Sequence, residues 1–161
     1  MTTYHQQAIK MAAQTPFRLR VKGTSMAPLL QNGDSLIVQP VPLERIKPGD
    51  LLTFRRNDEI VTHRLLAIRP TELILMGDNL YALDVPVLPE HILGRVTALQ
   101  KDDKQKSMQG AGWSLIHPTL AWLGRQSTGQ GTNLPPTGWA ARIPRAVSWL
   151  VRVLARQFLY F

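Results

Sequence analysis

The chain has 161 residues, no cysteine and a formal net charge of +8. This length suits one domain with its own core, and the lack of cysteine excludes disulfides, thiolate catalysis and thiolate metal sites. The first residues contain no export signal, and no run of about 18 uncharged apolar residues occurs. We therefore expect neither a membrane span nor export by the N-terminus of this chain.

The positive charge is concentrated in the last third of the chain. Residues 1–103 hold 12 Lys/Arg and all 11 Asp/Glu, whereas residues 104–161 hold 7 Lys/Arg and no acid. An anionic partner would be attracted to this last part.

Short runs rich in Val, Ile and Leu, separated by Pro, Gly, Asn and Asp, predict a mainly β fold. We expect a compact, coiled β-sheet domain over residues 16–100, after an N-terminal segment (1–15) with a short helix over Ala8–Gln14. The predicted strands are Phe17–Val21, Ser35–Gln39, Leu51–Arg55, Ile60–Ile68, Glu72–Met76 and Ile92–Leu99.

Residues 101–161 are expected to be linkers and a basic helical extension. The polar stretches Gln100–Gly112 and Ser127–Gly138 are typical of linkers, and Pro118–Gln126 predicts a short helix with proline at its first position. The strongest helix signal covers Arg142–Phe161.

That last helix is amphipathic. Arginines occupy one side, and the apolar residues of the other side are Ile143, Val147, Leu150, Leu154, Phe158 and Phe161. The arginines are Arg142, Arg145, Arg152 and Arg156. Either the helix lies on an anionic membrane surface, or the apolar stripe packs on the β domain or a partner chain and leaves the arginines solvated. Nucleic-acid binding is disfavoured because the β domain is nearly neutral and no reading helix is evident.

Ser25, in Gly23-Thr24-Ser25-Met26-Ala27-Pro28, is a candidate nucleophile. A serine hydroxyl needs a base to take its proton. The alternative is that Ser25 caps a one-turn helix.

His63, within the most strand-like run, is the candidate base, since imidazole titrates near pH 6.5. A lone strand histidine is more often structural, but no lysine that could replace it occurs between Lys47 and Lys101.

Two carboxylates could orient His63. Asp78 follows Gly77 directly after a predicted strand, and Asp84 lies six residues further on. A carboxylate beside the base fixes its tautomer and stabilises the imidazolium. The alternative is that Gly77-Asp78-Asn79 only forms a turn and has no part in catalysis. The four scattered histidines show no ligand spacing, so we expect no metal and no cofactor.

The ordered set of these motifs resembles the type I signal peptidase family, in particular its endoplasmic-reticulum and archaeal branch, where histidine replaces a lysine base. The set runs through Gly-x-Ser-Met-x-Pro, Gly-Asp, Pro-Gly-Asp, His-Arg, Gly-Asp-Asn and Ile-Leu-Gly-Arg-Val between Leu19 and Leu99. The resemblance implies a serine endopeptidase with Ser25 as nucleophile, His63 as base, and Asp78 and Asp84 as candidate orienting acids. It also implies an extended signal-peptide-like or leader-peptide substrate, held by strand addition.

Members of this family often carry a serine two positions before the nucleophile, where this chain has Gly23. The oxyanion would then be held by the backbone N–H of Ser25 and by the Thr24 hydroxyl. A repressor-type self-cleaving peptidase is disfavoured by the missing lysine. The rival of another class is a catalytically inactive module that binds a peptide or tethers a partner to a membrane. We expect a cytoplasmic location, or a peripheral one at the cytoplasmic face of the membrane.

Overall fold

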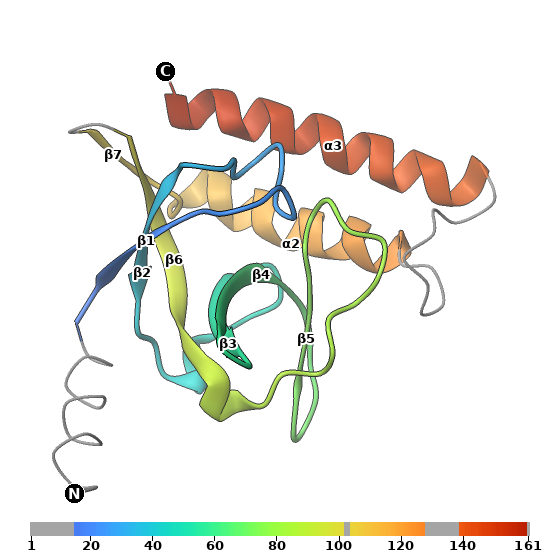
Figure 1. Ribbon diagram of the computed structural model, residues 1–161. Coiled ribbons are helices and arrows are strands. Elements are labelled where there is room, and N and C mark those ends of the chain that lie inside the picture. The colour runs from blue at the N-terminus through green and yellow to red at the C-terminus, as the bar shows by residue number, and fades with distance from the viewer. Residues whose placement is uncertain (1–14, 102–103, 128–138, 161) are drawn as a thin grey trace, which may run out of the picture.

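The computed structural model describes residues 15–101, 104–127 and 139–160, and there the chain forms a mainly antiparallel β domain followed by two helices (Figure 1). The fold class is therefore as predicted. The predicted helix over Ala8–Gln14 lies outside the described residues. The strands are β1 (Phe17–Arg20), β2 (Ser35–Gln39), β3 (Leu51–Arg56), β4 (Glu59–Ile68), β5 (Leu73–Met76), β6 (Ile92–Lys101) and β7 (Lys104–Ser107). The helices are α2 (Ala111–Gln126) and α3 (Trp139–Tyr160), with short 3-10 turns at Leu43–Arg45 and Pro89–His91.

The strands form one antiparallel sheet in the order β1-β2-β6-β3-β4-β5, with β7 added to β6. The register shifts in three of the pairings, β2 with β6, β3 with β6 and β4 with β5. Such irregularities bend strands and increase their twist. The sheet coils (Figure 1), and residues of β1 and β4 line the same cleft although three strands separate them in the sheet.

All six predicted strands are present, with ends that differ by at most two residues. The prediction of a linker over Gln100–Gly112 is wrong. β7 continues from the end of β6 as a hairpin, in which Ala98 pairs with Ser107 and Leu99 with Lys106. α2 then begins at Ala111. The polar side chains of β7 are tolerated because this short strand lies at an open position of the sheet.

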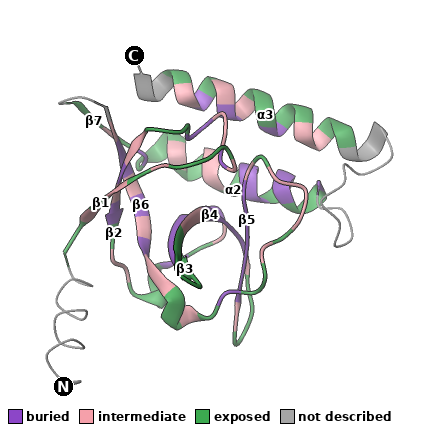
Figure 2. Cartoon of the chain, viewed as in Figure 1, coloured by how far each residue is buried: buried purple, intermediate pink, exposed green. Residues whose placement is uncertain are grey.

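The buried residues of the strands form the core, shown in purple in Figure 2. They alternate with less buried residues in β2, whereas the first four residues of β3 and all four of β5 are buried. One cluster includes Leu36, Val38 and Leu99 of the sheet together with Met26, Leu29 and Leu30. The last three come from the loop directly after Ser25. Packing of this loop into the core therefore holds the segment that carries Ser25.

α2 begins seven residues before the predicted start at Pro118, which lies inside the helix. The helix buries Leu120, Ala121 and Gly124, and Ala121 packs with Leu66 of β4 and Met76 of β5. This contact outweighs the hydrogen bond that Pro118 cannot make. The predicted position of the helix start is thus wrong, while its end at Gln126 is correct.

α3 lies along α2 and over the loop that follows β1 (Figure 1). It buries Ser148, Arg152 and Ala155, whereas the apolar residues Ile143, Val147, Leu150 and Leu154 are exposed. Of the alternatives that the sequence left open, packing of this stripe on the β domain is therefore wrong for these four residues. The side chains of Phe158 and Phe161, and residues 128–138 of the second predicted linker, lie outside what the structure describes. Neither described helix combines the length and apolar character needed to cross a bilayer.

Candidate active site

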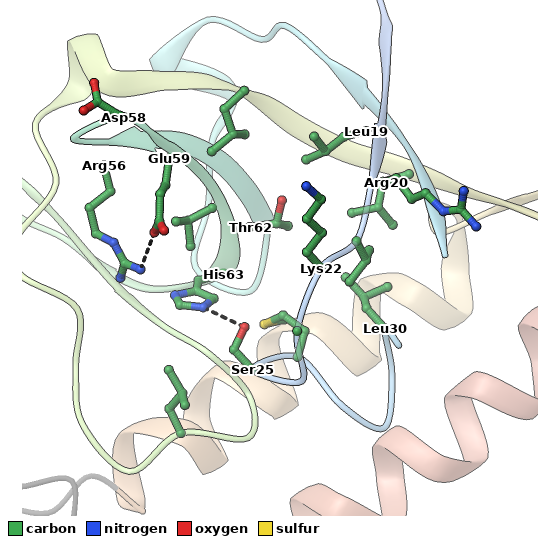
Figure 3. A pocket seen from close by; sticks show the side chains of 17 residues that line it. Leu19, Arg20, Lys22, Ser25, Leu30, Arg56, Asp58, Glu59, Thr62 and His63 are labelled. Atoms are coloured by element: carbon green, nitrogen blue, oxygen red, sulfur yellow. Dashed lines mark hydrogen bonds and ion pairs between the residues drawn. The ribbon is translucent and has the colours of Figure 1, made fainter. Parts of the chain in front are cut away.

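Ser25 and His63 meet at one end of the cleft. Ser25 lies in the loop after β1, and His63 points from β4 toward it (Figure 3). The Oγ atom of Ser25 is 3.0 Å from the Nε2 atom of His63. These residues are 38 positions apart in the chain, and the coiling of the sheet brings them within hydrogen-bonding distance.

Asp84 contacts the other nitrogen of the same ring. Its Oδ2 atom is 2.6 Å from Nδ1 of His63, and both side chains are nearly inaccessible to solvent. An ionised carboxylate only accepts hydrogen bonds, so Nδ1 carries the proton and Nε2 presents a lone pair to the Ser25 hydroxyl. Arg56 donates to the second oxygen of Asp84 at 3.3 Å. This arrangement fixes the histidine tautomer that can accept a proton from Ser25.

Asp78 has a different partner. Its carboxylate accepts two hydrogen bonds, both 2.7 Å long, from Nε and Nη2 of Arg64. Successive side chains of a strand point to opposite faces, so His63 and Arg64 point in different directions from β4. The two carboxylates that the sequence left open as alternatives thus bind different side chains, Asp84 at His63 and Asp78 at Arg64.

The loop between β5 and Asp84 packs tightly against the segment around Ser25. The N–H of Asn79 donates to the Ser25 carbonyl at 2.7 Å, and the Asn79 side chain donates to the Thr24 carbonyl at 3.2 Å. A Cβ atom at Gly77 would lie 2.9 Å from the Ser25 carbonyl oxygen. Glycine at position 77 therefore allows the close approach of the two loops.

Gly23 has a positive φ of +87°, a conformation that L side chains rarely adopt. Its N–H donates to the side-chain oxygen of Asn32 at 3.2 Å. The N–H of Ser25 donates to no acceptor among the described residues. This N–H is therefore available to a substrate oxygen. The preceding residue, Thr24, is exposed to solvent.

The cleft beside Ser25 has a volume of about 620 Å³. One wall is formed by β1 and the residues after it, from Leu19 to Gly23, and the other by Arg56 to His63 of the β3–β4 hairpin. Lys22 and Glu59 lie on these opposing walls (Figure 3). The apolar side chains of Met26, Leu30, Leu36 and Leu80 complete the lining. A cleft with two β walls and an apolar lining suits an extended peptide.

Three arginines of α3 bind backbone carbonyls of the loops that carry Ser25 and Asp84. Arg152 donates to the carbonyl of Ala27 at 2.8 Å, and Arg156 donates to that of Leu29 at 2.7 Å. Arg145 donates to the carbonyl of Leu80 at 2.8 Å. Burial lowers the pKa of Arg152 from its usual value. Sequence reasoning placed these arginines on the solvent or lipid side, and that expectation is wrong for all three.

His117 of α2 supports the buried Arg64 from the other side. Its Nδ1 atom lies 3.0 Å from Nη1 of Arg64, and its Nε2 atom lies 3.1 Å from the Met108 carbonyl. Because Arg64 only donates, the neutral imidazole carries its proton on Nε2. Two effects lower the pKa of His117 from 6.5 to about 4. The larger is burial, and the second is repulsion from the charge of Arg64. No local pattern predicts this contact, because Arg64 and His117 are 53 positions apart.

Residues 2–97 match the family model described as Peptidase S24-like. Proteins named inactive signal peptidase IA, from Staphylococcus aureus strains N315, MW2 and COL, are 32% identical to this chain over 69 residues. The aligned part covers 42% of this chain and 40% of each of those proteins, so the chain spans less than half of their length. No solved structure gives a significant match.

Proposed function

Because the chain belongs to the Peptidase S24-like family, we propose that it is a serine endopeptidase that cleaves a signal-peptide-like or leader-peptide substrate. Ser25 is the nucleophile, His63 the general base and Asp84 the acid that orients His63. The observation that carries the proposal is the continuous set of contacts from Asp84 through His63 to Ser25, with distances of 2.6 and 3.0 Å.

The chemistry proceeds through an acyl-enzyme. Ser25 Oγ attacks the carbonyl carbon of the scissile bond while Nε2 of His63 takes the hydroxyl proton. His63 then gives this proton to the leaving amine as the C–N bond breaks. A water molecule, deprotonated by His63, then attacks the acyl carbon. The bond between this carbon and Ser25 Oγ breaks, and His63 returns the proton to that oxygen. Asp84 remains ionised and stabilises the imidazolium during both steps.

The negative charge on the substrate oxygen needs hydrogen-bond donors. The N–H of Ser25 supports this role, because it has no acceptor among the residues that the structure describes. The Thr24 hydroxyl is the second donor in the proposal. Gly23 supplies no side-chain donor at the position where, by the resemblance to signal peptidases, a serine is often found. A missing oxyanion donor typically lowers the rate about 10²–10³-fold.

The substrate binds as an extended strand. Among the described strands β1 pairs only with β2, so its other edge has backbone groups that can pair with a peptide. The cleft runs along this edge toward Ser25. Small substrate side chains just before the cut follow from the resemblance to signal peptidases. Lys22 and Glu59, on opposite walls, favour substrates with charged groups farther from the cut.

A second candidate function is a peptide-binding module without catalysis. Two observations favour it: similar proteins carry the name inactive signal peptidase IA, and Gly23 lacks a side-chain oxyanion donor. The intact contacts of Ser25, His63 and Asp84 favour the enzyme instead.

Incubation of the purified chain with a mixture of synthetic peptides, followed by mass spectrometry, separates the two functions. The enzyme predicts internal cuts that share one residue preference and that disappear in the Ser25→Ala variant. Peptides that bind equally well to wild type and Ser25→Ala, without any cut, would establish the binding module instead.

A further inference from the structure

α3 is oriented with its arginines toward the protein and its apolar residues away from it. Arg152 is 3% exposed, whereas Ile143, Val147, Leu150 and Leu154 are 44–53% exposed. A helix on the surface of a soluble domain normally buries its apolar stripe. α3 shows the reverse, and Figure 2 shows no described element beyond its outer side.

The outward face of α3 is continuous and uncharged. Its exposed residues between positions 143 and 157 are Ile143, Ala146, Val147, Trp149, Leu150, Leu154 and Gln157. The three arginines within this stretch, at positions 145, 152 and 156, bind the loops beneath the helix. Fifteen helical residues extend about 22 Å, which makes a long apolar strip with no charge on it.

Basic side chains border this strip at both ends. Arg142 is exposed where the strip begins. β7 lies against α3 near its C-terminal end (Figure 1), and in this strand Lys104 is exposed and Lys106 half-buried. No acidic residue occurs between positions 104 and 161. Two copies packed face to face would bring these like charges together, which is unfavourable. An apolar strip with a basic border instead matches the acyl boundary and the headgroups of an anionic bilayer.

We propose that the outward face of α3, from Ile143 to Gln157, binds the surface of an anionic lipid bilayer, with the helix in the plane of the interface. The apolar side chains enter the boundary between headgroups and acyl chains, while Arg142, Lys104 and Lys106 contact the headgroups. The inward arginines make no lipid contact. Salt therefore weakens binding only in part, because the apolar contribution is not screened.

The same geometry places the candidate active site close to the bilayer. Arg152 links α3 directly to the Ala27 carbonyl, two residues from Ser25. One helix diameter, about 10 Å, thus separates the bound surface from the loop that carries Ser25. A peptide held at the membrane surface would therefore start close to the loop that carries Ser25.

Sedimentation with vesicles tests the proposal on the full chain. The wild type is mixed with phosphatidylcholine vesicles, or with vesicles that also contain phosphatidylglycerol. We expect sedimentation with the mixed vesicles and much less with the neutral ones. Leu150→Glu places a charge at the centre of the strip and should weaken binding about tenfold or more, because a carboxylate replaces a leucine that the bilayer would otherwise bury.

Leu43→Glu is the matched control, because Leu43 is 43% exposed in the 3-10 turn before β3 and lies outside the strip. It should bind as the wild type does. Circular dichroism and thermal unfolding of both variants establish that each is folded. Equal sedimentation of wild type and Leu150→Glu, or no sedimentation of the wild type with anionic vesicles, would overturn the proposal. If the wild type instead forms a dimer that Leu150→Glu dissociates, and the wild type does not bind vesicles, the strip is a contact between copies. That result would overturn the proposal as well.

Discussion

Asp84 and His63, 21 residues apart, are joined by a 2.6 Å hydrogen bond between Oδ2 and Nδ1. In Asp84→Asn the amide can donate to the ring, which favours the tautomer whose lone pair no longer faces Ser25. We expect turnover to fall about 10³–10⁴-fold, the loss typical of this change in serine peptidases. Single-turnover measurements on the folded variant check this value.

Asp78→Asn is the matched comparison, since its carboxylate binds Arg64 and not His63. Loss of one partner of a buried ion pair costs about 3–5 kcal/mol of unfolding free energy. We expect a lower melting temperature but nearly unchanged turnover per folded molecule. A variant that keeps its stability and loses turnover instead would indicate that Asp78 serves the reaction.

Gly77→Ala tests the contact between the two loops of the site. The added Cβ would meet the Ser25 carbonyl oxygen at 2.9 Å, so one loop must shift. We expect a loss of about 1–3 kcal/mol in stability, and a displaced nucleophile can lower the rate by up to about 100-fold. Gly112→Ala in α2 is the control, because its Cβ would meet nothing within 4 Å. Similar kinetics for both variants would refute this role of Gly77.

Arg152→Met tests the support that α3 gives to the Ser25 loop. The variant removes the hydrogen bond to the Ala27 carbonyl, and hydrogen bonds to charged groups contribute about 1.5–3 kcal/mol. We expect the free energy of unfolding, measured in urea, to fall by this amount. We also expect Ser25 to react more slowly with a serine-directed probe. Arg142→Met, on an exposed residue of the same helix, should change stability by less than about 0.5 kcal/mol. Equal stability of the two variants would contradict the role assigned to Arg152.

His117 should make the fold sensitive to acid. Its pKa is about 4 in the folded chain, below the ordinary value of 6.5, so the unfolded chain binds the proton first as the pH falls. Its contribution to stability is therefore complete above pH 6.5 and is lost progressively down to about pH 4, by on the order of 3 kcal/mol. His117→Gln, which cannot titrate, should lose less stability over the same range. Urea unfolding at several pH values checks this, and parallel curves for both proteins would contradict it.

The sequence predicted the strands well because runs rich in Val, Ile and Leu, bounded by turn residues, mark them locally. β7 was missed because Lys104–Ser107 lacks apolar residues and is held only by its pairing with β6. The start of α2 was misplaced because Pro118 is a strong helix-start signal, and its packing partners Leu66 and Met76 lie far away in the chain. Local pattern identifies elements, but distant contacts decide their ends.

The same difference between local pattern and distant contacts applies to the candidate active site. The sequence suggested Ser25, His63 and two carboxylates as candidates, but only the folded loops bring Asp84 to His63 and leave Asp78 with Arg64. The periodicity of α3 separated its arginines from its apolar residues correctly. It could not indicate which side faces the protein, because the acceptors of Arg152 and Arg156 are carbonyls about 125 residues earlier.

The most direct test of the proposed catalytic serine is its reaction with a fluorophosphonate probe, located by mass spectrometry of the intact folded chain. The account predicts one adduct on Ser25, none in Ser25→Ala, and a strongly slowed reaction in His63→Ala, because only a serine with an adjacent base is nucleophilic enough. Absence of any adduct on the folded wild type, or equal labelling rates of wild type and His63→Ala, would contradict it.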